Sequence, residues 1–151
     1  MDTLSLVLIA LAAALALIGL GGGLYEFSVV DPAWPARPAL IQPQRGGLVR
    51  RRFWIPAHIA LELTLLAVLV AAWSQPPVRQ WLLVALASHA AMRIWSAFDF
   101  IPKALRFERA DPDAIAEDDA RRWTRRSRWR MPLDLITCAA LMAAFGTAAR
   151  L

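Results

Sequence analysis

Residues 53–95 read FWIPAHIALELTLLAVLVAAW (53–73), SQPPVRQ (74–80) and WLLVALASHAAMRIW (81–95). The first and third parts belong to apolar runs of membrane length, and the middle part is a short turn that contains two prolines. Helices joined by a short connection are usually antiparallel neighbours. The stretch therefore predicts two membrane helices that lie side by side and run in opposite directions.

Two further apolar runs flank this pair. Residues 3–25 read TLSLVLIALAAALALIGLGGGLY, and residues 131–149 follow a charged segment. No Lys or Arg precedes the first run, so we expect a retained helix there and not a cleaved signal peptide. A membrane helix needs about 20 apolar residues. We therefore predict an all-α fold, one integral membrane four-helix bundle over 1–151, with helices at about 3–25, 53–74, 78–100 and 131–149.

The composition and the charge pattern support a membrane protein. Of the 151 residues 58% are hydrophobic, above the roughly 45–50% of soluble domains, and the mean hydropathy is +0.45. Fourteen of the 17 Lys and Arg residues lie in the segments 37–52 and 103–130, beside the apolar runs. This arrangement sets membrane topology, so the pI of about 10.9 does not indicate a nucleic-acid partner.

The basic residues also predict the orientation. The segment between the first two helices carries five Lys and Arg, and that between the last two carries nine. The opposite side has only Arg79 and Arg150. We therefore expect both long loops in the cytoplasm and both termini outside, in the bacterial inner (cytoplasmic) membrane. We expect Trp34, in the first long loop, to lie at the membrane interface. Pro102 should end the third helix. An amphipathic helix should begin near Asp113 in the second long loop.

Two pairs of ionisable residues lie inside the central helices. His58 and Glu62 are four residues apart on one helix, and His89 and Arg93 are four apart on the other, so each pair shares a helix face. A rise of about 1.5 Å per residue puts His58 and Arg93 about 7 Å from the cytoplasmic ends, and Glu62 and His89 about 13 Å. Intramembrane charges usually face a bundle interior or a wet cavity. These residues are the candidate catalytic group.

Other polar residues lie in the same half of the predicted bundle. We take Glu26, Trp95, Asp99 and Asp134 as candidate substrate-binding residues around a pocket that opens toward the cytoplasmic side. A purely structural role and a metal site are the two alternatives to a pocket. The charges would be purely structural if Glu62–His89 and Glu26–Arg93 are ion pairs that fix helix register. A di-iron site would need a second carboxylate–histidine motif that this chain lacks, so we expect no metal.

Several motifs resemble one membrane family. They are EFSVVDPAWP (26–35), IQPQRGGLVRRRFWIP (41–56), a Pro after FDF (98–100), and RRWTRRSRWR (121–130). Their order resembles the small four-helix membrane family that contains the fungal anthrone oxygenases and many bacterial proteins. Trp123, Thr124, Arg125 and Arg130 match the segment before the last helix. Ser127 stands where the family has Asn, and the asparagines that the family carries after helix three are missing.

The resemblance implies a cofactor-independent oxygenase. Such an enzyme deprotonates an electron-rich phenolic or ketonic carbon acid, and the carbanion reacts with O₂ directly. His58 or His89 would be the base, Arg93 would stabilise the enolate, and Glu62 or Glu26 would orient the histidine. The alternative is a non-catalytic small subunit, or a lipid- or pigment-binding component, of a larger membrane complex. The expected partners are membrane lipid, an apolar small molecule, and a second copy or a membrane-complex subunit.

Overall fold

The structure, a computed structural model, describes residues 2–151. Every regular element in that range is helical, and four helices are long and apolar enough to cross a membrane. The expected all-α architecture with four membrane-length helices is therefore confirmed, and the length and composition of these helices make the chain an integral membrane protein.

The α-helices follow the predicted spans closely. The membrane-length helices are α1 (Thr3–Tyr25), α2 (Arg51–Ala71), α3 (Pro76–Trp95) and α6 (Met131–Ala148). The shorter ones are α4 (Ile101–Arg109) and α5 (Glu117–Ser127). Two π-helical turns, η1 (Glu26–Val30) and η5 (Ser96–Phe100), follow α1 and α3. Short 3-10 turns occupy 34–36, 38–41, 43–45, 112–114 and 128–130.

Pro102 does not end the third helix, contrary to the prediction. The turn η5 joins α3 to α4, and the combined helix Pro76–Arg109 has 34 residues. Proline lacks an N–H and collides with the carbonyl four residues before it. In η5 the N–H of Ile101 bonds to the carbonyl of Ser96, five residues back. This wider turn makes room for Pro102, so the helix continues beyond the membrane-length segment.

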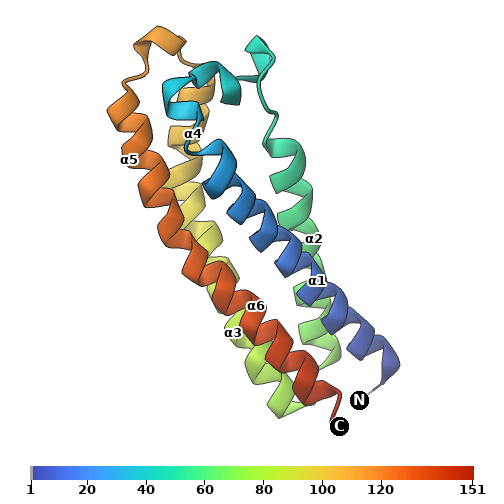
Figure 1. Ribbon diagram of the computed structural model, residues 1–151. Coiled ribbons are helices and arrows are strands. Elements are labelled where there is room, and N and C mark those ends of the chain that lie inside the picture. The colour runs from blue at the N-terminus through green and yellow to red at the C-terminus, as the bar shows by residue number, and fades with distance from the viewer. Residues whose placement is uncertain (1) are drawn as a thin grey trace.

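The last helix is also longer than expected. The helix predicted to begin near Asp113 begins at Glu117, and a 3-10 turn joins α5 to α6. The combined helix Glu117–Ala148 has 32 residues. Two long helices, α3–α4 and α5–α6, therefore extend beyond α1 and α2 at one end of the molecule, as Figure 1 shows.

The bundle has two unlike ends (Figure 1). Both termini and the turn between α2 and α3 lie at one end, and the loop 31–50 lies with α4 and α5 at the other, which we call the polar end. Helix α6 packs along α3 and also against α1, which in turn packs against α2. The neighbours α2 and α3 do touch, as their short connection predicts, but α3 packs far more extensively on α6. We call the looser α2–α3 contact the seam.

The half of the bundle nearer the termini is an apolar core. Small residues of α1, such as Ala12 and Ala16, are buried there and let α6 approach closely. Branched residues fill the rest: Ile9, Leu65, Val68, Val78, Leu82 and Leu141 are all fully buried. Apart from Arg79 in the first turn of α3, this core leaves the ionisable residues of the spans in the other half, toward the polar end.

The polar end has its own aromatic core. Trp34 is fully buried, with its ring centroid 5.3 Å from that of Phe107 and 5.9 Å from that of Trp123. Trp34 thus packs inside the protein, because the loop 31–50 folds back onto α4 and α5, and its level at the membrane interface stays a prediction. The amide of Gln42 donates hydrogen bonds of 2.9 Å to the carbonyls of Phe107 and Ala110, which satisfies free acceptors at the end of α4.

Gly47 is required for this fold of the loop. A Cβ on Gly47 would overlap the carbonyl oxygen of Ala39 and lie 2.7 Å from the backbone nitrogen of Gln42. We predict that Gly47→Ala lowers the free energy of unfolding by roughly 1–3 kcal/mol. Thermal unfolding in detergent measures this loss.

The matched control is Gly146→Ala in α6, where a Cβ would meet nothing within 4 Å. Because alanine favours a helix over glycine by about 1 kcal/mol, this variant should be as stable as wild type or more so. Equal stability of Gly47→Ala and wild type would contradict the packing of the loop on the polar end.

Candidate functional site

Two histidines face each other across the seam. The ring centroids of His58 on α2 and His89 on α3 are 5.6 Å apart, with an angle of 43° between the rings. Trp54, one turn before His58, stacks on its ring with a centroid distance of 5.4 Å and an angle of 19°. The four-residue spacing on α2 thus holds the imidazole of His58 between an indole and a second imidazole.

Glu62 completes the cluster. Its Oε1 accepts a hydrogen bond of 2.9 Å from Nε of Arg93 and lies 3.5 Å from Nε2 of the buried His89. Glu62 and His89 are therefore close, as their equal depth predicts. Arg93 reaches Glu62, in the other predicted layer, because a long side chain can extend along one helical turn.

The histidine cluster borders a very small cavity. The cavity holds about 20 Å³ and is lined by His58 and His89 together with Asp134 and Thr137 of α6 and several residues of α1. That volume suits one water molecule, which needs at least about 10–15 Å³. The structure thus brings Asp134 to the histidines, while Glu62 and Arg93 do not line the cavity and have partly exposed side chains.

Glu26 is held by other residues than expected. Its carboxylate accepts hydrogen bonds from Arg50 at 2.9 Å and from the indole N–H of Trp54 at 2.7 Å. The alternative pair Glu26–Arg93 is therefore not formed. Glu26 nevertheless holds the indole of Trp54, which stacks on His58, so Glu26 is linked to the cluster through Trp54.

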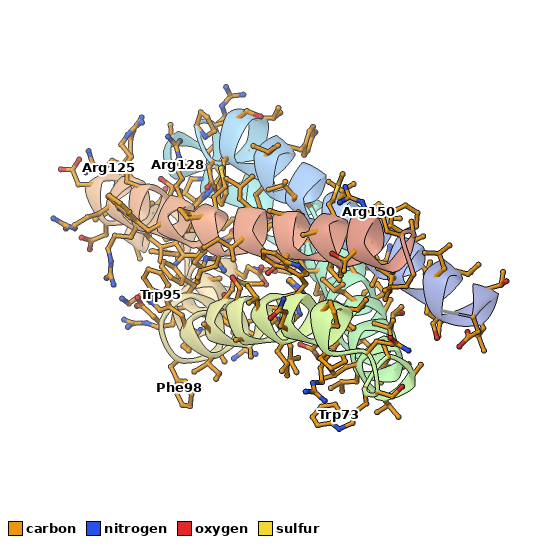
Figure 2. The ribbon with its side chains drawn as sticks, turned by 90° about the horizontal axis from the view of Figure 1, so that it is seen from below. Trp73, Trp95, Phe98, Arg125, Arg128 and Arg150 are labelled. Atoms are coloured by element: carbon orange, nitrogen blue, oxygen red, sulfur yellow. The ribbon has the colours of Figure 1, made fainter. Side chains whose placement is uncertain are left out.

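Trp95 and Asp99 lie outside the cluster. The ring centroid of Trp95 is 5.5 Å from that of Phe100, and Asp99 accepts hydrogen bonds from Lys103 at 2.7 Å and Arg126 at 2.6 Å. Figure 2 shows Trp95 on the same side of the view as Arg125, far along the bundle from Trp73 and Arg150. Both candidates therefore belong to the polar end and not to the histidine cluster.

Sequence reasoning missed two arginines that organise this half of the bundle. Arg50 forms ion pairs with Glu26 at 2.9 Å and with Glu108 of α4 at 3.0 Å. From the sequence, the arginines at 50–52 indicate only the orientation in the membrane. Arg130 donates a hydrogen bond of 2.7 Å to Oγ of Ser96, and its guanidinium lies 4.4 Å from the ring centroid of Phe100. The sequence gives no sign of these partners, because each bond joins distant segments.

Asp31 is a buried acid just beyond α1 and η1. Burial first, and the negative charge of Glu26 second, raise the pKa of Asp31 to about 6, and a hydrogen bond of 3.2 Å from the indole of Trp34 opposes this shift. A carboxyl with a raised pKa holds its proton more tightly in the native state. Its contribution to stability therefore falls as the pH rises from 3.8 toward 6.

The cluster offers acid–base chemistry. Nε2 of His89 is buried and has no directed hydrogen bond, so its lone pair or proton is available to a neighbouring group. Arg93 presents a planar cation that can stabilise an oxyanion. Within residues 2–151, no group of three or more His, Cys, Asp or Glu side chains is arranged to hold a metal ion.

The Glu62–Arg93 pair gives the first test of the cluster. Arg93→Leu would leave a carboxylate without its partner in an apolar layer, so the free energy of unfolding should fall by on the order of 2–3 kcal/mol. The double variant Arg93→Leu/Glu62→Gln should recover most of this loss, since no charge then lacks a partner. Arg93→Lys should keep wild-type stability, because an ammonium also neutralises Glu62.

Thermal unfolding in detergent provides the comparison, with Arg79→Leu in the first turn of α3 as the control for loss of one arginine. Failure of the double change to restore stability would contradict a coupled pair.

Comparisons with protein-family models, with curated proteins and with solved structures find no match to this chain. The case for a function therefore rests on the chemistry of the cluster.

Proposed function

We propose that the chain is an integral membrane enzyme that abstracts a proton from an apolar aromatic or ketonic substrate, in the manner of the cofactor-independent anthrone oxygenases. One observation carries the proposal. Two imidazoles, a carboxylate and a guanidinium from α2 and α3 form a chain of contacts, His58 to His89, His89 to Glu62 and Glu62 to Arg93, within the membrane-length segments. Ionisable groups placed there are costly and are usually functional.

The proposed roles follow from the contacts. His58 or His89 accepts the proton of an acidic carbon, since imidazole has an unperturbed pKa near neutrality. Glu62 orients His89, and Arg93 stabilises the enolate oxygen as the electron pair of the broken C–H bond moves onto it. The carbanion then gives its electron pair to O₂, the oxidant that the family resemblance implies, and the peroxide that forms takes the proton back from the imidazolium. No cofactor is needed for these steps.

The seam is the proposed route for the substrate. The cavity of about 20 Å³ is far smaller than the roughly 300–1,000 Å³ of typical ligand pockets. The side chains of Glu62 and Arg93, however, are 39% and 33% exposed at the surface between α2 and α3. Because α3 packs mainly on α6, α2 can separate from α3 without breaking the larger contact. A flat substrate would enter from the lipid through this opening.

A second candidate is a non-catalytic subunit, or a lipid- or pigment-binding component, of a larger membrane complex. The small cavity and the pairing of Glu62 with Arg93 favour it, because both suit a cluster that only fixes helix register. Purification separates the two candidates. A subunit should leave the membrane with fixed partners, whereas an enzyme should run as a monomer or a small homo-oligomer.

The proposed topology places the polar end in the cytoplasm and both termini outside, in a bacterial inner membrane. The basic segments 37–52 and 103–130, which carry 14 of the 17 Lys and Arg residues, support this orientation. Ser74, in the turn between α2 and α3, would then be outside, and Ala116, just before α5, would be inside.

Cysteine labelling tests the orientation. With Ser74→Cys, a membrane-impermeant maleimide should label intact cells, and with Ala116→Cys it should label only after permeabilisation. Cys138 is buried and should give little background. Labelling of residue 116 from outside would reverse the proposed topology.

Turnover tests the enzyme. We predict that proteoliposomes catalyse exchange of an anthrone methylene proton with D₂O and consume O₂. Whichever is faster in wild type, proton exchange or O₂ uptake, should fall by about 10²-fold or more in His58→Gln and in His89→Gln. Arg93→Lys should be stable but slower, since an ammonium lacks the planar fork.

The control is Thr147→Val, which changes a polar residue of α6 near the C-terminus, away from the cluster. Absence of exchange and O₂ uptake in folded wild type, together with co-purification of a partner, would favour the subunit instead.

A further inference from the structure

A second, larger cavity lies at the polar end and is separate from the histidine cluster. It holds about 870 Å³ between α4, the connection 110–116 and α5, and we call it the α4–α5 groove. Phe100, Phe107 and Trp123 contribute an aromatic wall to it. Its volume falls in the range of ligand-binding sites, roughly 300–1,000 Å³.

The groove carries an excess of positive charge. Five cations line it: Lys103, Arg106, Arg109, Arg122 and Arg126. Asp119, the one lining carboxylate, pairs with Arg122, and Lys103 and Arg126 share the carboxylate of Asp99. Among residues 2–151, Arg106 and Arg109 have no ion-pair partner within 4 Å. The groove therefore attracts an anion.

Trp123 adds a donor without an acceptor. This residue is 9% exposed and lines the groove, and its indole N–H is buried with no hydrogen-bond partner in the described chain. Buried donors in proteins nearly always have an acceptor. Because the indole nitrogen has no accessible surface, an anionic oxygen in the groove would reach it after a small shift of the ring, and this unpaired donor is an observation independent of the arginines.

The position of the groove identifies the kind of anion. Phe98 is 83% exposed and points away from the bundle near Trp95, which is 38% exposed (Figure 2). Trp129 is 70% exposed. Exposed Trp side chains at the ends of membrane helices are enriched at the interface between hydrocarbon and headgroups. The ring of Trp95 lies 5.5 Å from that of Phe100, which lines the groove, so we infer that the groove starts at the level of the lipid headgroups.

We propose that the α4–α5 groove binds the headgroup of an acidic phospholipid from the adjacent leaflet. The phosphate would contact Arg106 and Arg109 and accept a hydrogen bond from the indole of Trp123. The upper part of an acyl chain would leave the groove past Leu105, which lines it and is partly exposed. This site does not depend on the proposed enzymatic activity of the seam.

Lipid titration of the delipidated full-length protein in detergent tests the proposal, with native mass spectrometry and thermal unfolding as readouts. Dioleoylphosphatidylglycerol should bind at one saturable site and raise Tm, and dioleoylphosphatidylcholine should bind at least tenfold more weakly. Inorganic phosphate at the same concentration should not stabilise the protein. Equal effects of the two lipids would overturn the proposal, and so would equal effects of phosphate and phosphatidylglycerol.

Matched variants place the site. Arg106→Gln/Arg109→Gln should weaken phosphatidylglycerol binding by at least about tenfold, since each basic residue near an anionic headgroup contributes on the order of 1 kcal/mol. Arg121→Gln/Arg125→Gln removes the same charge from α5 residues outside the groove and should leave binding within twofold of wild type. Equal losses in both pairs would mean general surface attraction and would overturn a built site.

Trp123→Phe tests the orphaned donor without a change of charge. It keeps an aromatic ring in the wall and should weaken binding several-fold while Tm without lipid stays near that of wild type. Unchanged affinity in this variant would remove the indole from the site. Unchanged affinity in Arg106→Gln/Arg109→Gln would overturn the proposal as a whole.

Discussion

The packing of α3–α4 against α5–α6 is the contact on which both candidate sites depend. Within the spans it includes the hydrogen bond of 2.8 Å from Oγ of Ser88 to the carbonyl of Leu133, beside His89. Nearer the polar end, Arg130 bonds Ser96 across the same pair of helices. The pair thus places Asp134 beside the histidines, and the rings of Phe107 and Trp123, 6.1 Å apart, join the two walls of the α4–α5 groove. Helices α1 and α2 complete the bundle from one side, which leaves the seam as its looser boundary.

Neutralisation of charge arranges the polar half. A charge that faces hydrocarbon is costly, so acids and bases there pair with one another. Arg50 links Glu26 after α1 to Glu108 of α4, and Glu62 links α2 to Arg93 of α3. These bonds join segments that apolar packing alone would not align. Beyond the spans, not every cation is paired, and the α4–α5 groove keeps an excess of positive charge.

The four spans are predictable from sequence because an apolar run of membrane length has one stable conformation in lipid. The proximity of Glu62 and His89 follows from helical rise alone. The partner of Arg93 does not follow from helical rise. The arginine side chain is long enough to span the distance between the level of His58 and the level of Glu62. The π-helical turn before Pro102, the burial of Trp34 and the partner of Glu26 depend on how the loop 31–50 and α4 fold together, and no local pattern encodes such distant contacts.

The central position of α6 has a consequence for biosynthesis. Because α6 packs on both α1 and α3, the most extensive helix contact of the bundle forms only after the last span has left the ribosome and entered the membrane. Until then, α3 meets only α2 along the looser seam, and His89 lacks the neighbours that bury it. The nascent chain therefore passes through a stage in which the polar face of α3 is not yet covered by α6, and only insertion of the last span removes that face from its surroundings.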